Sequence, residues 1–394
     1  AKSNERLILC PYYLASEEMQ WTLLSLCVVA AAEGASSPPE FEVVETLDHP
    51  VIGEKDGVPF GIFHGFEGGL YMRTEEDGVY HLFPSEAMHD DKTLPWDVHM
   101  QSHHWTSPDG VHNWTRHQLI YESSANYNGT DRRSSIFAPM PLWDKDENRW
   151  HVFYVGYTCG PHAASQGFPG QVDGAIFRVR SETAGRGGLG GPYPADKAEM
   201  IINMQGAGGA AQDWEGGLPH GQGDDSFYAW QLPNGTWAAF YGSHKRYDED
   251  PPQWKVGLAV ADRLSGPWQR LGRSYNPANY IEHPMGIENP IVTRTTDGEW
   301  FVAIFDALFQ KRTAGITYSA DGLHWSAAQY VNLQAMKSGC GTVRTPQGLV
   351  PEPQRCRGCY SVLYTGGDGH YENECWILLR NRAEAFDAAA VLIV

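Results

Sequence analysis

NGTWAAFYGSH, residues 234–244, opens with the turn pair Asn234-Gly235 and continues through Trp237 into an apolar run. Alternation of large apolar residues after such a turn is typical of a half-buried β-strand entered from a hairpin. The same pattern of a turn, an aromatic residue and alternating apolar residues recurs at DGVYHLFPSEA (77–87), ENRWHVFYVGY (147–157), DGEWFVAIFDA (297–307) and RGCYSVLYTGG (357–367). The copies begin roughly 60–90 residues apart, which leaves room for about four strands in each repeat.

The surroundings of the repeated hairpin recur as well. A strand-like run comes before each turn: EGGLYMRTEE (67–76), FAPMPLWDKD (137–146), DSFYAWQLP (225–233), NPIVTRTT (289–296) and GTVRTPQGLV (341–350). Later turns close on an aromatic residue, as in SPDGVHNW (107–114), SADGLHW (319–325), LGGPY (189–193) and LSGPW (264–268).

These repeats predict an all-β protein, a five-bladed β-propeller with four-stranded antiparallel blades around a central axis. The alternative is a β-sandwich, whose turns come every 8–12 residues without this longer period. The apolar end AAAVLIV (388–394) is interpreted as a strand that helps to close the last blade.

The composition of the chain excludes some partners. The 394 residues carry a formal net charge of −19 and contain no basic runs. Such a chain is a poor ligand for nucleic acid or an anionic membrane, so we expect neither as a partner. An acidic balance by itself indicates little more than solubility.

The N-terminal region predicts a secretory route. WTLLSLCVVAAA (21–32) is too short for a comfortable membrane span, and small residues follow it. We interpret 19–36 as a secretory signal that starts at Met19, 1–18 as an upstream segment of unknown role, and 37–394 as a single propeller domain. The alternative is a buried N-terminal helix, because Glu17 and Glu18 precede the run without any basic residue.

Sequons and cysteines bear on the same prediction. Asn113, Asn128 and Asn234 each open an Asn-X-Ser/Thr sequon, as a secreted glycoprotein would have. The C-x-x-C at 356–359 lacks a second pair at zinc-site spacing, so we expect no structural zinc. In an exported protein, one or two disulfides would form among the cysteines at positions 159, 340, 356, 359 and 375.

The first strand of each blade would line the central channel, so the residue that opens it is a candidate for function. Blades one, three and four open with acids, Glu67, Asp224-Asp225 and Glu288, whereas blades two and five open with Ala138-Pro139-Met140 and Gly341-Thr342. Two carboxylates that face each other across a sugar ring are the usual machinery of glycoside hydrolysis. A third acid nearby raises the pKa of the proton donor by like-charge repulsion. We therefore assign Glu67 as base or nucleophile, Asp224 as tuner and Glu288 as acid.

The order of these motifs resembles the five-bladed glycoside hydrolases of family 43 and their propeller relatives. The matching phrases are Glu67-Gly68-Gly69, Phe137-Ala138-Pro139-Met140, Gly223-Asp224-Asp225-Ser226 and Ile287-Glu288-Asn289-Pro290, within roughly residues 55–380. The resemblance implies an inverting hydrolase with Glu67 as general base, Asp224 as pKa modulator and Glu288 as general acid.

Three departures mark the chain as a distant branch. Glu67 stands where the family usually has Asp, and Met140 replaces an Asp. In blade five the family often has a His that helps to hold a central ion, whereas the matching phrase here offers Cys340. We therefore expect no central calcium ion near Cys340, and no other metal or cofactor.

Several polar and aromatic residues are candidate sugar contacts. His64, His220 and His283 lie three to five residues before the acids, and Asp225 follows Asp224. Trp105 could supply a platform for a sugar face, and Arg132 would suit a carboxylated or sulfated sugar. The alternatives are loop histidines with ordinary hydrogen bonds and a Trp105 that only packs a blade.

The favoured interpretation is a secreted glycoside hydrolase that acts on an oligo- or polysaccharide. Its carboxyl groups should lie about 6.5–9.5 Å apart if it inverts, and about 5–5.5 Å apart if it is a retaining glycosidase or transglycosidase. A non-catalytic, lectin-like propeller is the alternative of a different class. It would tend to carry several similar shallow sites around the ring.

Overall fold

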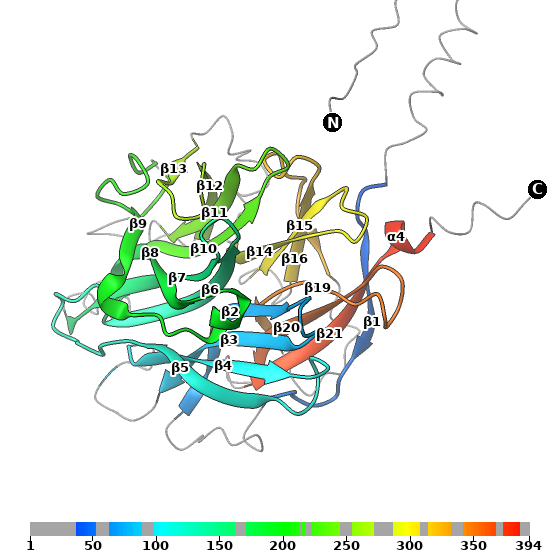
Figure 1. Ribbon diagram of the computed structural model, residues 1–394, viewed down its shortest axis with the longest axis horizontal. Coiled ribbons are helices and arrows are strands. Elements are labelled where there is room, and N and C mark those ends of the chain that lie inside the picture. Colours follow the sequence, from blue (N-terminus) through cyan, green and yellow to red (C-terminus); the bar gives the residue numbers. More distant parts are fainter. Residues whose placement is uncertain are drawn as a thin grey trace, which may run out of the picture. The chain divides into compact units, whose positions relative to one another are not determined.

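The computed structural model describes residues 37–52, 63–88, 94, 98–161, 171–212, 214–216, 222–244, 254–271, 287–307, 314–331, 342–367 and 373–386. The chain divides into two compact units, Ala1–Ser37 and Pro38–Val394, and all described strands belong to the second (Figure 1). The predicted upstream segment and secretory signal lie outside the described residues. In the described part of the chain, none of the helices has the length and apolar character needed to span a membrane.

The described strands form antiparallel meanders in which sequence neighbours pair (Figure 1). The first contains β2 (Phe63–Arg73), β3 (Tyr80–Met88), β4 (Met100–Ser107) and β5 (Thr115–Glu122). The second contains β6 (Ser135–Asp144), β7 (Arg149–Cys159), β8 (Gln171–Ala184) and β9 (Glu199–Asn203), with the short 3-10 helices η2 (Arg186–Gly190) and η3 (Ala195–Lys197) between β8 and β9.

The next meanders repeat this order. One contains β10 (Gly223–Gln231), β11 (Trp237–His244), β12 (Trp254–Ala261) and β13 (Gln269–Arg270). Another contains β14 (Glu288–Arg294), β15 (Phe301–Asp306), β16 (Ala314–Ser319) and β17 (Gln329–Tyr330). A single parallel pair, Gly223 with Gly174, joins the second and third meanders into one eight-stranded sheet.

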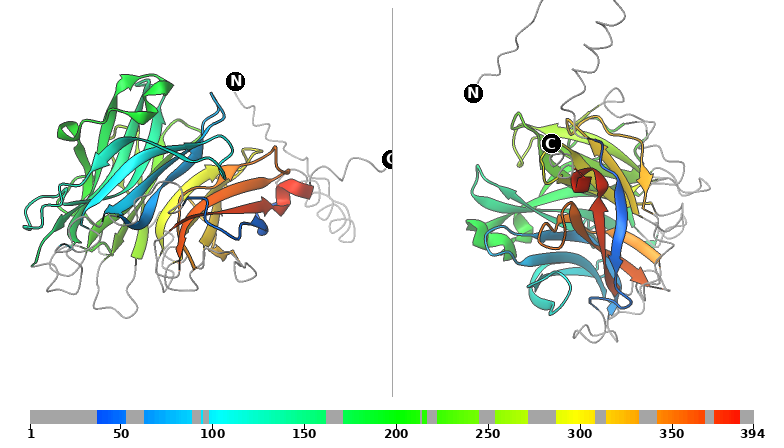
Figure 2. Two further views of the ribbon diagram at one scale, coloured as in Figure 1. Left: turned by 90° about the horizontal axis from the view of Figure 1, so that it is seen from below. Right: turned by 90° about the vertical axis from the view of Figure 1, so that its right-hand side faces the viewer.

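The last sheet combines both ends of the described chain. It contains β18 (Thr342–Pro346), β19 (Val350–Pro351), β20 (Cys359–Gly367), β21 (Asn373–Asn381) and, as its outer strand, β1 (Phe41–Thr46). The short helix α4 (Arg382–Phe386) follows β21. Figure 2 shows β1, in blue, beside β21.

The outer described strand of the last sheet comes from the beginning of the described chain, since β1 pairs with β21. The C-terminal run 388–394, which we expected to help close this sheet, lies outside the described residues. Glu42 of β1 accepts hydrogen bonds from Arg380 and Arg382, the latter at 2.8 Å. The pairing therefore ties residues more than 330 positions apart.

The repeated phrases adopt the predicted elements. Each of the five copies supplies the second strand of a meander, namely β3, β7, β11, β15 and β20, and each preceding run supplies the first strand. The closing phrases also repeat in structure. Asp109 Oδ1 accepts from the backbone of Val111 and His112, and the equivalent Asp321 Oδ1 accepts from Leu323 and His324.

The first strands pack against one another in sequence order. β2 contacts β6, β6 contacts β10, β10 contacts β14, β14 contacts β18, and β18 contacts β2. One buried cluster includes a residue from each first strand: Leu70, Met140, Phe227, Ile291 and Val343. Burial of each such side chain stabilises the fold by about 1.5–3 kcal/mol. This shared core brings the opening residues of the strands together.

The C-x-x-C motif forms a disulfide between Cys356 and Cys359. Cys375 is also disulfide-bonded, and Cys159 is buried in β7. Cys340 lies outside the described residues.

Candidate active site

Arg344 of β18 stands among carboxylates from three other strands. Its Nη1 lies 2.7 Å from Oδ2 of Asp306 and 3.5 Å from Oε2 of Glu288, and its Nη2 lies 3.8 Å from Oε1 of Glu67. These residues come from β18, β15, β14 and β2, so the packing of the strands has gathered them from distant parts of the sequence. Two of the predicted acids, Glu67 and Glu288, thus flank one guanidinium.

Glu67, Glu288 and Arg344 each stand at a β-bulge in their strand. The strand register shifts directly after Glu67 in β2, after Glu288 in β14 and after Arg344 in β18. In each strand the next residue, Gly68, Asn289 or Thr345, has a positive φ of 47°, 49° or 34°. Such β-bulges re-aim a side chain out of the ordinary alternation and are common beside functional sites. The bulges therefore turn Glu67, Glu288 and Arg344 toward one another.

Asp306 is the cross-strand partner of Glu288. The two acids are paired in the β14–β15 register, an arrangement that would be destabilising for two isolated carboxylates. The guanidinium of Arg344 and the backbone N–H of Thr345 both bind Asp306 Oδ2, the latter at 3.0 Å. Their positive charge and donated hydrogen bond offset the repulsion between the acids.

Asp225 reaches the same group from β10. Its Oδ1 accepts a hydrogen bond from the hydroxyl of Tyr157, and its charge acts on both Arg344 and Glu288. Burial raises the pKa of Asp225, and the Tyr157 hydrogen bond and Arg344 oppose that rise. The third-strand acid next to Glu288 is therefore Asp225, which the sequence suggested only as a sugar contact.

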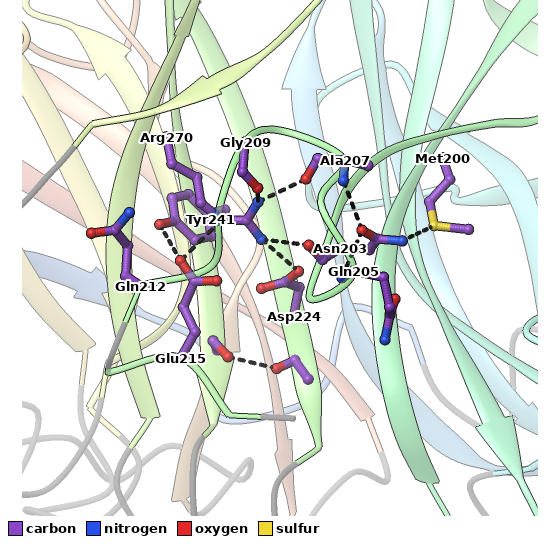
Figure 3. Close-up of polar contacts among 12 residues, drawn as sticks. Met200, Asn203, Gln205, Ala207, Gly209, Gln212, Glu215, Asp224, Tyr241 and Arg270 are labelled. Atoms are coloured by element: carbon purple, nitrogen blue, oxygen red, sulfur yellow. Dashed lines mark hydrogen bonds and ion pairs between the residues drawn. The ribbon is translucent and has the colours of Figure 1, made fainter. Parts of the chain in front are cut away.

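Asp224, the predicted tuner, contacts a different group. Its Oδ2 lies 3.2 Å from Nη2 of Arg270, whose Nε donates to Glu215 at 2.9 Å (Figure 3). Arg270 also donates to the backbone carbonyls of Ala207, Gly209 and Asn203, so its guanidinium holds the β9–β10 connection (Figure 3). Asp224 thus pairs with Arg270, and the acids whose charges act on Glu288 are Asp225, Asp306 and Glu67.

The bulge of β10 explains this exchange of roles. The register shift of β10 follows Asp224, as those of β14 and β18 follow Glu288 and Arg344. In β10, however, the residue with a positive φ is Gly223, which precedes the acid instead of following it. A glycine adopts this conformation without the cost that a Cβ imposes. With the left-handed residue shifted, it is Asp225 that points toward Arg344, and its neighbour Asp224 points toward Arg270.

The pKa of Glu288 is raised well above its ordinary value. Burial is the main cause, and the negative charges of Asp225, Asp306 and Glu67 add to it, while Arg344 opposes them. A buried carboxyl that holds its proton at neutral pH can act as a general acid. Glu288 Oε2 and Asp306 Oδ1 are buried without a hydrogen-bond partner in the described part of the chain. Unsatisfied buried carboxylates are rare where packing alone decides a sequence.

Two predicted sugar contacts have other roles in the structure. Trp105 is 1% exposed and donates from Nε1 to Oε1 of Glu86 at 2.8 Å, so it is not an open aromatic platform. It packs edge-on against Phe66 within the first meander. Arg132 pairs with Asp173 at 2.8 Å and donates to Gln205, away from the carboxylate group. Both side chains hold neighbouring strands together.

The three predicted histidine contacts cannot be placed. His220 and His283 lie outside the described residues, and His64 is described only in its backbone, within β2. The segments that precede β2, β10, β14 and β18 also lie outside the described residues.

The charged group does not fit a metal ion. Arg344 already supplies a fixed cation beside Glu67, Glu288 and Asp306, and a second cation there would be repelled. Elsewhere in the described residues, Asp144, Glu147 and His151 have ligand atoms within 4.8 Å of one another. There Arg178 donates to His151 Nδ1 at 2.9 Å and Arg180 lies 3.2 Å from Glu147, so guanidinium groups again occupy the place of a cation.

Sequence reasoning missed Arg344 and Asp306. A sequence signal for Arg344 was present: in Phe137-Ala138-Pro139, Glu288-Asn289-Pro290 and Arg344-Thr345-Pro346 the site residue stands two positions before a proline. The structure gives these phrases the same register shift. This alignment makes Arg344, rather than Gly341-Thr342, the equivalent of Glu288 in the last sheet.

The chain was compared with known proteins by sequence and by fold. No family model matches it, and no curated protein matches it by sequence. The family 117 glycoside hydrolase Zg3597 from the marine bacterium Zobellia galactanivorans has a similar structure, with 12% identity and a TM-score of 0.53 over 88% of this chain and 91% of that chain.

Family 43 glycoside hydrolases are also among the similar structures. CoXyl43, a β-xylosidase/α-arabinofuranosidase from a compost microbial metagenome, has 10% identity and a TM-score of 0.48 over 86% of this chain and 94% of that chain. An enzyme from Xanthomonas citri, complexed with xylotriose, has 10% identity and a TM-score of 0.48 over 84% and 89%. The match to Zg3597 confirms, for the fold, the predicted resemblance to propeller glycoside hydrolases. A fold at such low identity does not establish an activity.

Proposed function

We propose that residues 38–394 form a five-bladed β-propeller and act as a glycoside hydrolase on an oligo- or polysaccharide. The closed series of contacts among β2, β6, β10, β14 and β18 supports the five blades, because each of these strands opens one meander. β1 would then complete the fifth blade by pairing with β21.

The proposed catalytic pair is Glu67 and Glu288. Glu67, as general base, removes a proton from a water molecule, whose oxygen attacks the anomeric carbon. Glu288, as general acid, gives its proton to the leaving glycosidic oxygen as the carbon–oxygen bond breaks. The product sugar has the opposite anomeric configuration, and water restores the two protonation states.

Asp225 and Arg344 have supporting roles in this proposal. Asp225 adds negative charge beside Glu288 and so favours its protonated form. Arg344 holds Asp306 and lies between the two catalytic carboxyls, where it keeps them apart and fixes their orientation. Asp224, the modulator implied by the family resemblance, instead stabilises the β9–β10 connection through Arg270.

One observation carries the proposal: a buried glutamic acid with a raised pKa shares a guanidinium with a second glutamate from another strand. Buried charges cost several kcal/mol each unless they are fully compensated. Four carboxylates beside one arginine are therefore a poor choice for stability alone. Perturbed acids of this kind cluster at catalytic sites.

The stereochemistry of the reaction tests the proposal. Purified protein is mixed with plant and algal oligosaccharides, and proton NMR follows the anomeric signal of the first product. We expect the configuration opposite to that of the substrate. First appearance of the same configuration would point to a retaining glycosidase or transglycosidase. Saturable binding of oligosaccharides without cleavage would contradict the proposed hydrolase and favour the lectin-like alternative.

We also propose that the protein is secreted. The sequon residues Asn113, Asn128 and Asn234 are all exposed, so each is accessible for glycosylation. Enzymatic deglycosylation of protein made in a eukaryotic host should lower its mass. An unchanged mass would count against this route.

A further inference from the structure

A hollow of about 430 Å³ lies at the far end of the first meander from the carboxylate group. It is bounded by the β2–β3 turn, by His81, His104 and His117 on β3, β4 and β5, and by η2. Thr74, which lines it, follows Glu67 by seven residues along an extended strand. At the rise of a β-strand the two are roughly 20 Å apart, so this hollow is not part of the candidate active site.

A chain of hydrogen bonds fixes the protons of two of these histidines. The hydroxyl of Thr74 contacts Oδ1 of Asp77, and Thr74 Oγ1 lies 3.2 Å from Nε2 of His81. Burial acts to raise the pKa of Asp77, but the hydrogen bonds from Thr74 and Val79 outweigh it and the pKa is lowered. Asp77 is therefore an acceptor, and the Thr74 hydroxyl must donate to it. Thr74 Oγ1 then accepts the proton of His81 Nε2.

The same reasoning extends to His104. Burial lowers the pKa of His81 to about 4 and that of His104 to about 3, so both rings are neutral at pH 7. Because His81 carries its proton on Nε2, its Nδ1 is an acceptor. His104 Nε2, 2.8 Å away, must donate to that nitrogen. Nδ1 of His104 is left with a bare lone pair.

This lone pair has no partner in the described part of the chain, although His104 is only 8% exposed. It faces η2: a methyl group built on Gly190 would lie 3.5 Å from His104 Nδ1. Nδ1 of His104 is nevertheless not one of the fully buried polar atoms that lack a hydrogen bond, so it is open to the hollow. A ligand hydroxyl or a water molecule can donate to it there.

The neighbouring groups specify the occupant further. Gln118 donates to the carbonyl of Gly190 at 2.9 Å, which leaves its own amide oxygen as an acceptor. Arg186 pairs with Glu76 at 3.1 Å and lies over the indole of Trp143 at 4.3 Å. The two free groups, Nδ1 of His104 and the amide oxygen of Gln118, are both acceptors, and Arg186 and Glu76 pair with each other. A hydroxyl group, which donates and accepts, suits such a lining better than an ion.

We propose that this hollow is a second binding site for a neutral, hydroxyl-rich ligand, a sugar unit, with a ligand hydroxyl donating to Nδ1 of His104. The site does not take part in bond cleavage, and only the identification of the polyol as a sugar rests on the proposed function. Its place at the opposite end of the strands would let the protein hold a glycan apart from the catalytic carboxyls.

Nitrogen NMR of the histidine side chains tests the site directly. The Glu288→Gln protein is labelled with ¹⁵N-histidine and titrated with D-glucose, D-galactose, D-xylose and L-arabinose in turn. We expect His104 Nδ1 to resonate as an unprotonated nitrogen and to shift saturably with at least one sugar. His112, an exposed histidine that is paired with Asp109 outside the hollow, serves as an internal control and should not shift.

Two variants separate the site from general unfolding. Gly190→Ala places a methyl group beside His104 Nδ1 and 1.8 Å from the flexible end of Gln118, and should weaken the sugar affinity about tenfold, the loss expected for one hydrogen bond. His104→Phe keeps the ring stack on Phe83 but removes the acceptor, and should abolish sugar binding to the hollow.

Several results would overturn the proposal. A proton on His104 Nδ1 in the free protein, no shift with any of the sugars, or an unchanged sugar affinity in folded Gly190→Ala would each do so. A response to Zn²⁺ alone would identify a metal site instead. Sugar binding here in a protein that cleaves no glycan would refute the proposed function and leave this inference standing.

Discussion

At the scale of single residues, two neighbouring acids on β10 contact different groups: one acts on the proposed general acid, and the other forms a structural ion pair. Asp225 acts on Glu288 through its charge, whereas Asp224 pairs with Arg270. The sequence alone could not distinguish them, because the direction of a side chain at a bulge depends on which residue becomes left-handed. Here Gly223 takes that conformation.

The first prediction compares Asp225→Asn with Asp224→Asn. The negative charge of Asp225 raises the pKa of Glu288, so its removal lowers that pKa. A general acid works only while protonated, and the alkaline limb of the pH–rate profile should therefore move to lower pH. Asp224→Asn should leave that limb in place. Equal shifts in both variants would contradict the assignment.

The second prediction concerns Arg344→Met. Arg344 lowers the pKa of Glu288, so its loss should move the alkaline limb to higher pH, opposite to the effect of Asp225→Asn. Removal of one partner from a buried charge group should also reduce the free energy of unfolding by about 3–5 kcal/mol. Urea denaturation measures that loss.

A matched control for Arg344 is Lys197→Met. Lys197 pairs with Glu182 on the surface at 2.6 Å, and such solvent-exposed pairs contribute little to stability. If the two variants lost similar free energies of unfolding, Arg344 would not be the centre of the charge group.

At the scale of the strands, repetition made the meanders predictable. Each hairpin is a local structure whose turn, aromatic residue and alternation all lie within a dozen residues, as in 234–244. The role of β1 was not predictable in this way, because its pairing with β21 joins the two ends of the chain. Trp105 was also misjudged, since its partner Glu86 lies on the neighbouring strand β3.

The third prediction removes the outer strand. A chain that begins at Leu47 loses the six residues of β1, including Phe41, whose ring packs edge-on against Tyr360 at 5.6 Å. Compared with a chain that begins at Pro38, it should lose about 2–5 kcal/mol of unfolding free energy, from several net backbone hydrogen bonds. Its exposed β21 edge should also promote aggregation.

The control for this truncation is Val44→Ala. Val44 lies at the bulge of β1 and is 44% exposed, so its loss should change the unfolding free energy by less than about 0.5 kcal/mol. A truncated chain that is as stable as this variant would show that β1 does not complete the sheet.

At the scale of the whole molecule, the buried acids couple stability to pH. Burial raises the pKa of Glu374 from 4.5 to about 8, although a hydrogen bond from Gln347 opposes the rise. A raised pKa in the folded state means that the native protein binds a proton that the unfolded chain releases. The contribution of Glu374 is therefore fully present below pH 4.5 and is lost as the pH rises to about 8.

The fourth prediction follows from this loss of stability with rising pH. Glu374→Gln keeps the shape and hydrogen-bonding capacity of the protonated acid but cannot ionise. Relative to the wild type, its unfolding free energy should increase steadily between pH 5 and pH 8, as measured by urea denaturation at each pH. Glu75→Gln, at an exposed position, should give a constant difference. A constant difference for Glu374→Gln as well would contradict the raised pKa.

The sequence predicted the all-β class and the second strand of every meander, and two of its candidate acids, Glu67 and Glu288, lie beside one guanidinium. It missed Arg344 because a basic residue was not sought among acids, although its spacing from Pro346 matches that of Glu288 from Pro290. It assigned Trp105 and Arg132 to sugar contact because residue type does not reveal a buried partner. The partners of Arg344, Trp105 and Arg132 lie on other strands, and such contacts between strands form only in the folded chain.

The rate of reducing-end release from a panel of plant and algal polysaccharides, with wild type and Glu288→Gln side by side, tests the central claim most directly. We predict turnover of at least one polysaccharide by the wild type and a loss of about a hundredfold or more in the folded variant, because only the proton donor has been removed. Release from none of the polysaccharides, or equal rates for the two proteins, would contradict the account.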